Sequence, residues 1–219
     1  MCWNQDVSLN TFLFACLALL FIYITNTYTK YKTPTFDNPL VYVFFFLVAG
    51  MQLIEFFLWR NLKNKKINEQ LSKLASVDVF MQQLTLILLI PNLTIRFGMA
   101  LSYLLFVLFY TTYKGIYDPI HYYTTVGENG HLSWGWTNYT GYETIWAIIC
   151  LFFYLSAALL INNFMFSLFL LTTMAISTFF YYKYNTLASM WCWLLSTFLL
   201  YFLVHILLIQ PFREYSGLC

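Results

Sequence analysis

Charged residues are scarce in this sequence. Lysine, arginine, aspartate and glutamate make up 9% of its 219 residues, against about a quarter in soluble domains, while hydrophobic residues make up 61%. So little charge excludes a water-soluble globular fold, because the polar groups could not cover its surface. The net charge of only +2, without a basic stripe, also excludes nucleic acid as a partner.

Motifs for metals, cofactors and catalysis are missing as well. The five cysteines form no C-x-x-C or zinc-type spacing, and the sequence has no H-E-x-x-H, no G-x-S-x-G and no P-loop. We therefore expect no cofactor, no catalytic residue and no metal. Of three classes of function, namely transport or binding, a structural role and a membrane enzyme, the enzyme has the weakest support. Its only candidate site is a group of loop residues whose spacing matches no standard metal motif: His121, Glu128, His131 and Glu143.

Apolar segments occupy most of the chain. Each is close to the ~20 residues that a helix needs to cross a bilayer, although three have only 17. They predict an all-α fold: a polytopic integral membrane protein with a single domain, 1–219, that is a bundle of seven transmembrane helices. The predicted helices are 9–25, 40–59, 77–95, 97–113, 145–161, 164–182 and 189–209.

The basic residues predict the orientation. The loops after the second, fourth and sixth predicted helices lie on the side of the N-terminus and hold Arg60, Lys63, Lys65, Lys66, Lys73, Lys114 and Lys183. The opposite side holds Lys30, Lys32, Arg96 and Arg213. Seven against four places the N-terminus in the cytoplasm and the C-terminus on the opposite side of the membrane. The sequon at Asn138 would then be cytoplasmic and unmodified, so a glycan there would reverse this topology.

Two connections differ in their expected roles. The segment 61–73 is polar and charged, and we interpret it as a solvated cytoplasmic loop. The segment 114–144 is about five times longer than a common loop, and loops of this length usually cap, gate or bind. Within it, residues 131–136 suggest a short hairpin or an interfacial cap, with Trp134 and Trp136 as anchors at the level of the lipid headgroups.

A polar layer is predicted near the cytoplasmic surface. Gln52 and Glu55 share one face of the second predicted helix, and Asp78 and Gln82 share one face of the third. Glu55 and Gln82 are each about four residues from the cytoplasmic ends of these helices, so they would lie at one depth and could touch. Gln83 lies beside them.

Two interpretations of this layer stay open. A carboxyl group inside a membrane often marks a pathway, so Glu55 could accept a proton or a cation, or anchor a polar ligand group. Alternatively the glutamine amides could bridge the carboxyl group and only lock the helices together. The second interpretation is favoured for Gln83, and for Glu55 the two are equal.

A second polar level is predicted toward the opposite surface, near the ends of four helices. It contains His205, which is the only histidine inside an apolar segment. Hydrogen-bonded packing is a commoner role than ligand binding for such a histidine, but we include it among the candidate site residues. The middle of the bundle offers hydroxyl groups and a thiol but no charge. That pattern argues against a charged ion pathway and allows a neutral solute, a lipid or a sealed bundle.

Three stretches of the sequence resemble a family of uncharacterised multi-pass membrane proteins from large DNA viruses, bacteria and algae: residues 1–4 with their Met-Cys-Trp motif, 50–55 and 78–83. The family pattern has Met-Glu and a nearby Gln in helix two, and His followed four residues later by Gln-Pro in helix three. Here Gln52 and Glu55 have the order exchanged, Asp78 stands at the His position, and Gln83 replaces the Pro. The resemblance implies a domain of unassigned function, and its viral branch implies a host or virion membrane.

These observations predict a membrane protein that binds or translocates a small molecule or ion. The ligand or ion site would consist of Glu55, Gln52, Asp78, Gln82, Gln83 and His205. The alternative is a structural or scaffold membrane protein, such as a viral membrane component, without transport. The expected partners are the lipid bilayer and a small-molecule or lipid ligand, and a homo-oligomer is left open.

Overall fold

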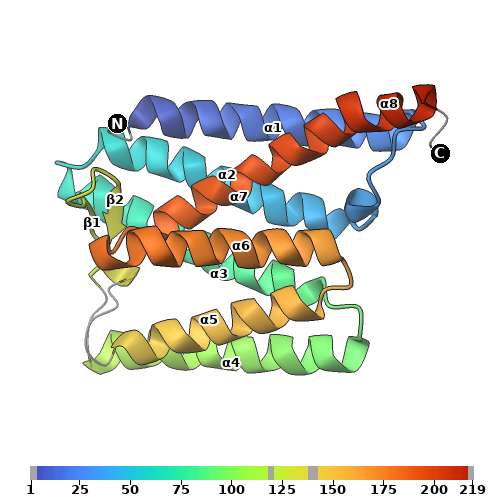
Figure 1. Ribbon diagram of the computed structural model, residues 1–219. Coiled ribbons are helices and arrows are strands. Elements are labelled where there is room, and N and C mark those ends of the chain that lie inside the picture. Colours follow the sequence, from blue (N-terminus) through green and yellow to red (C-terminus); the bar gives the residue numbers. More distant parts are fainter. Residues whose placement is uncertain (1–3, 118–120, 138–142, 217–219) are drawn as a thin grey trace.

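The computed structural model describes residues 4–117, 121–137 and 143–216, and nearly all of its regular structure is helical (Figure 1). The helices are α1 (Gln5–Tyr28), α2 (Pro39–Arg60), α3 (Lys65–Leu88), α4 (Leu93–Tyr117), α5 (Glu143–Leu160), α6 (Phe164–Tyr181), α7 (Leu187–Val204) and α8 (Gln210–Tyr215). A π-helical turn, His205–Ile209, joins α7 to α8 without a break. Single 3-10 turns lie at Pro34–Asp37 (η1), Gly135–Thr137 (η2) and Tyr182–Tyr184 (η3). The all-α prediction is confirmed.

Six helices of the described chain are long and apolar enough to cross a membrane: α1, α2, α3, α4, α6 with η3, and α7 with its continuation to Tyr215. The seventh, α5, has 18 residues and a length of about 27 Å, a little less than the ~30 Å of bilayer hydrocarbon. Six apolar helices are typical of a membrane protein. The predicted number of seven crossings therefore depends on α5.

The long helices lie side by side, with their connections gathered at two ends (Figure 1). The N-terminus and a small hairpin lie at one end, and the C-terminus and the α1–α2 connection lie at the other. Apolar side chains face outward over much of the bundle, among them Leu105, Leu108 and Phe109 of α4, each more than half exposed. An exposed apolar surface of this extent suits contact with lipid.

Asparagine begins five of the helices. The side-chain oxygens of these asparagines accept hydrogen bonds from backbone N–H groups in the first turn of α1, α2, α3, α4 and α6, and the residues are Asn4, Asn38, Asn64, Asn92 and Asn163. These N–H groups have no partner within the helix, and capping by asparagine satisfies part of them. The sequence therefore defines several helix starts by local chemistry.

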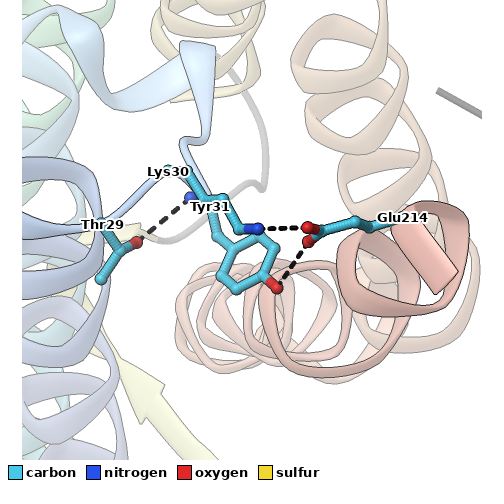
Figure 2. A network of polar contacts seen from close by, with 4 residues as sticks. All are labelled: Thr29, Lys30, Tyr31 and Glu214. Carbon is cyan, nitrogen blue, oxygen red and sulfur yellow. Dashed lines mark hydrogen bonds and ion pairs between the residues drawn. The ribbon is translucent and has the colours of Figure 1, made fainter.

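The end that carries the C-terminus is fastened by a cluster between the α1–α2 connection and α8 (Figure 2). Lys30 forms an ion pair with Glu214, and the Tyr31 hydroxyl donates to the other oxygen of the same carboxylate at 2.8 Å. The backbone N–H of Tyr31 donates to Thr29 Oγ1 at 3.1 Å. These contacts join the α1–α2 connection to α8 at this end of the bundle, although the side chains are exposed and each contact contributes little.

The interpretation of 61–73 as a solvated loop is wrong. Only a short connection follows α2, and α3 begins at Lys65, twelve residues before the expected start at 77. Its first turns carry exposed charges on one side, but Asn68 and Ser72 on the other side are completely buried. They are buried because they hold the hairpin of the long loop.

The long loop forms a cap at the end of the bundle that carries the N-terminus. Its strands β1 (Thr124–Val126) and β2 (Leu132–Trp134) pair antiparallel, which confirms the predicted hairpin. Asn68 Nδ2 donates to the backbone oxygen of Thr124 at 2.9 Å, and the Thr124 N–H donates back to Asn68 Oδ1 at 2.8 Å. Asn129 Nδ2 donates to Thr186 Oγ1 at 2.8 Å, which joins the hairpin to the start of α7.

The anchoring role predicted for Trp134 is wrong. Its side chain is 1% exposed and belongs to the hydrophobic core, and the Trp136 ring stacks on it with ring centroids 5.1 Å apart. A headgroup anchor would have to reach the outer surface. The tryptophan pair instead fills the space between the hairpin and the helices, which sequence spacing cannot show.

Candidate functional site

Glu55 and Gln52 form a buried pair on α2. Their exposed fractions are 1% and 0%, and Gln52 Nε2 donates to Glu55 Oε2 at 3.3 Å. The remaining oxygens, Gln52 Oε1 and Glu55 Oε1, meet no donor with hydrogen-bond geometry among the described residues. The ion pairs seen among the described residues, Lys30 with Glu214 and Lys73 with Glu69, do not involve Glu55. Among the described residues the Glu55 carboxyl group accepts a hydrogen bond from Gln52 but forms no ion pair, so little stabilises a negative charge on it.

Asp78 and Gln82 form a second pair on α3. Gln82 Nε2 donates to Asp78 Oδ2 at 2.6 Å, and Gln82 is 1% exposed whereas Asp78 is only partly buried. Gly50 of α2 lies opposite: a Cβ atom at this position would be 3.8 Å from Asp78 Oδ1. That distance is an ordinary van der Waals contact, so it shows that the Asp78 carboxylate lies close to α2 at Gly50.

Helix α7 connects the two pairs, which sequence reasoning missed. The Ser189 hydroxyl lies beside the Glu55 carboxyl group, and Cys192 Sγ contacts Gln82 Oε1 at 3.8 Å. Cys192 is completely buried and close enough to both Glu55 and Asp78 to interact with them electrostatically. Ser189 and Cys192 are three residues apart, so they share one face of α7. That spacing was readable in the sequence, but nothing in it indicated that this face meets α2 and α3.

Glu55 and Gln82, which were predicted to lie at one depth, are hydrogen-bonded to Gln52 and Asp78 and not to each other among the described contacts. Each pair is bonded within its own helix, and Asp78 lies opposite Gly50, which is five residues, or about 7.5 Å, along α2 from Glu55. The cause is the early start of α3, which places Gln82 seventeen residues into the helix, whereas Glu55 is five residues from the end of α2. The polar layer is a staggered cluster of three helices.

Gln83 points in another direction. Its Nε2 donates to the backbone oxygen of Cys150 on α5, and the side chain is 8% exposed. Adjacent residues on a helix project about 100° apart, so Gln82 and Gln83 serve different interfaces of α3. Gln83 therefore bridges two helices, which is the role that sequence analysis favoured for it.

His205 lies far from this cluster, in the π-helical turn after α7. Its Nδ1 is 3.2 Å from Gln210 Nε2, which also donates to the backbone oxygen of Lys32 at 2.8 Å. Asn163 Nδ2 similarly donates to Thr35 Oγ1 at 2.9 Å. This second polar level joins connections at the end of the bundle, so His205 is separate from Glu55.

Other predictions concern metals and the N-terminal motif. Among the residues that the structure describes, no three His, Cys, Asp or Glu side chains are placed to hold a metal ion. The sequon at Asn138 and the Met1 to Trp3 motif lie outside the described residues. Comparison with protein-family models, curated proteins and solved structures gave no match.

Proposed function

We propose that this chain is a polytopic membrane protein of seven crossings, with its N-terminus in the cytoplasm, that binds and moves a proton or a small cation through Glu55 and Gln52. One observation carries the proposal. Two oxygen atoms of one hydrogen-bonded pair, Gln52 Oε1 and Glu55 Oε1, are buried inside a bundle of apolar helices and have no hydrogen-bond partner among the described residues. Acceptors in this state favour a species that brings positive charge or a hydrogen to donate.

A proton suits the geometry better than a metal cation. The two side chains are already in contact, at 3.3 Å, so a cation between them would have to separate α2 side chains that are fully packed. A proton needs no such space. A protonated Glu55 would become a donor, and a turn of the Gln52 amide would present its oxygen to that proton.

The surrounding groups could relay the proton. Ser189 and Cys192 of α7 lie on one side of Glu55, and Asp78 with Gln82 lies beyond Cys192 on α3. Asp78 is the member of the cluster that is only partly buried. The order Asp78, Gln82, Cys192, Ser189, Glu55 therefore runs from a partly accessible carboxylate to a buried one.

Flux into liposomes tests this proposal. We expect purified protein in liposomes that enclose a pH-sensitive dye to carry protons when a potential is imposed, and Glu55→Gln to abolish the flux. Glu69→Gln is the matched control, because Glu69 is an exposed carboxylate of α3 paired only with Lys73. Equal flux with Glu55→Gln and with the wild type would contradict the proposal.

A structural role is the second candidate, and specific bonds favour it. Gln82 is bonded to Asp78 and Gln83 is bonded to α5, so these predicted site residues form hydrogen bonds without a ligand. Under this role Glu55→Gln changes thermal stability alone. The resemblance to the uncharacterised viral, bacterial and algal family, and with it a host or virion membrane, remains a proposal that suits either role.

A further inference from the structure

A cavity of about 300 Å³ lies between α3, α5, α6 and α7, and it is separate from the Glu55 cluster. Two pairs of adjacent residues show this separation. Gln82 and Cys192 contact each other within the cluster that contains Glu55, whereas Gln83 and Trp191 line the cavity. Helices α3 and α7 are thus the common wall between the cluster and the cavity.

The cavity wall is mainly apolar and aromatic. Much of it consists of rings from α3, α5 and α7, as well as from α4 and the turn after the hairpin: Phe80, Tyr110, Trp136, Trp146, Tyr154 and Trp191. Flat rings favour flat ligands, because stacked and edge-to-face contacts add to the burial of apolar surface. The volume is at the lower limit of small-molecule sites.

The cavity opens on the outer surface of the bundle. Ile148 of α5, Thr178 of α6 and Tyr182 of η3 line the cavity and are also exposed. Helices α5 and α6 lie closest near their short connection and diverge toward the hairpin end (Figure 1). The opening therefore lies between two apolar helices, where a molecule dissolved in lipid would enter.

Two indole N–H groups of residues that line the cavity, Trp136 and Trp191, are buried without a hydrogen-bond partner among the described residues, and Trp136 belongs to the turn after the hairpin. The Trp136 ring is held by the stack on Trp134. A buried donor without an acceptor is costly, and a ligand carbonyl group would remove that cost. The Trp136 donor is rigidly placed, because the stack fixes the plane of the ring.

We infer that this cavity binds a lipid-soluble molecule with a flat ring and a carbonyl acceptor, a quinone in chemical class, which enters between α5 and α6 and accepts from Trp136. The ring packs among the aromatic side chains. The apolar tail of such a molecule leaves through the opening beside Ile148. Binding requires no chemical step and does not depend on Glu55.

Binding of a short-chain ubiquinone to the purified protein in detergent, measured by tryptophan quenching and by thermal shift, tests this inference. We expect saturable binding and a raised Tm. Trp136→Phe keeps the ring but removes the N–H, and we expect about tenfold weaker binding. Trp59→Phe is the matched control, because Trp59 also has a buried N–H without a described partner but does not line the cavity, and we expect unchanged affinity.

A second pair of variants tests the location. Ala147→Phe fills the cavity and should abolish binding, whereas Ala175→Phe adds the same ring to an exposed position on α6 and should leave it unchanged. If Ala147→Phe does not fold, Ala188→Leu on α7 fills the cavity less drastically. No saturable binding, equal binding of an acyl ester without a ring, or unchanged binding in both cavity-filling variants would overturn the inference.

Discussion

The side chains of Gln52 and Glu55 occupy positions where apolar residues would pack more favourably. Their two free oxygens lose water without gaining a donor, and each such group costs on the order of 1–3 kcal/mol. A residue kept only to lock helices together should use its polar atoms fully. The unused oxygens are therefore the feature of this site that points to a ligand.

This cost leads to a prediction about stability. Replacing both residues, as Gln52→Met with Glu55→Met, removes the unpaired oxygens and keeps flexible side chains of similar volume. We expect Tm, followed by circular dichroism in detergent, to equal or exceed that of the wild type, while proton flux is lost. The structural role predicts the opposite sign, a lower Tm, because the lock between the helices would be gone.

At the scale of elements, the hairpin cap depends on one residue of α3. Asn68 satisfies both the N–H and the C=O of Thr124, and Ser72 Oγ lies 2.7 Å from Thr124 Oγ1 in the same buried contact. These bonds join two segments that are 56 residues apart in the chain. The cap is thus held by buried polar contacts more than by its own two short strands.

Asn68→Ala should release this cap. It leaves two buried backbone groups of Thr124 unpaired, each costing on the order of 1–3 kcal/mol. We expect faster hydrogen exchange of amides in 121–137, with exchange in α2 and α6 unchanged. Asn61→Ala is the control, because the Asn61 side chain donates to the Phe57 backbone oxygen at the exposed end of α2, away from the hairpin. Unchanged exchange in the hairpin would show that other contacts hold the cap.

The hairpin should also respond to pH through His131. Burial lowers the pKa of His131, whose ring packs edge-on against Tyr181 with centroids 5.4 Å apart. The folded state therefore binds a proton less readily than the unfolded state, so stability is present above the ordinary histidine pKa of about 6.5 and is lost as pH falls through it. We expect hydrogen exchange of the Gly127 amide, corrected for its intrinsic pH dependence, to speed up below about pH 6.5. In His131→Phe this acceleration should disappear.

Particular elements show what could be read from the sequence. The bounds of α2 and α6 were predicted to within one residue, because apolar runs flanked by Asn38 and Asn163 define them. The start of α3 was not predicted, because Asn68 and Ser72 are polar and their burial depends on a hairpin distant in sequence. The pairs within α2 and within α3 could be predicted, because residues three or four apart share one face of a helix. The contribution of Ser189 and Cys192 could not, because it depends on how α7 packs against the other helices.

At the scale of the whole molecule, the number of crossings decides where the termini lie. Seven crossings place them on opposite sides of the membrane, whereas six, without α5, place them on one side. Helix α5 is close to the required length. Helix α5 also packs against α4, because the rings of Phe153 and Tyr103 are in contact with their centroids 5.3 Å apart. Helix α4 is itself long and apolar enough to cross a membrane.

Cysteine accessibility tests this arrangement. In a variant without its natural cysteines, we expect Lys63→Cys, between α2 and α3, to react with a membrane-impermeant maleimide only from the cytoplasmic side. Lys32→Cys, between α1 and α2, should react only from the opposite side. A cysteine added after Cys219 should share the side of Lys32→Cys, and labelling on the side of Lys63→Cys would contradict seven crossings.

We propose that Glu55 holds a proton inside the bundle, and this proton can be observed directly. Infrared difference spectroscopy of the protein in lipid, taken between acidic and alkaline buffer, observes the C=O stretch of protonated carboxylic acids directly. If Glu55 holds a proton, the wild type shows a band from a carboxylic acid in an apolar environment. That band is absent in Glu55→Gln and unchanged in Glu69→Gln. The same band in wild type and Glu55→Gln would contradict this proposal.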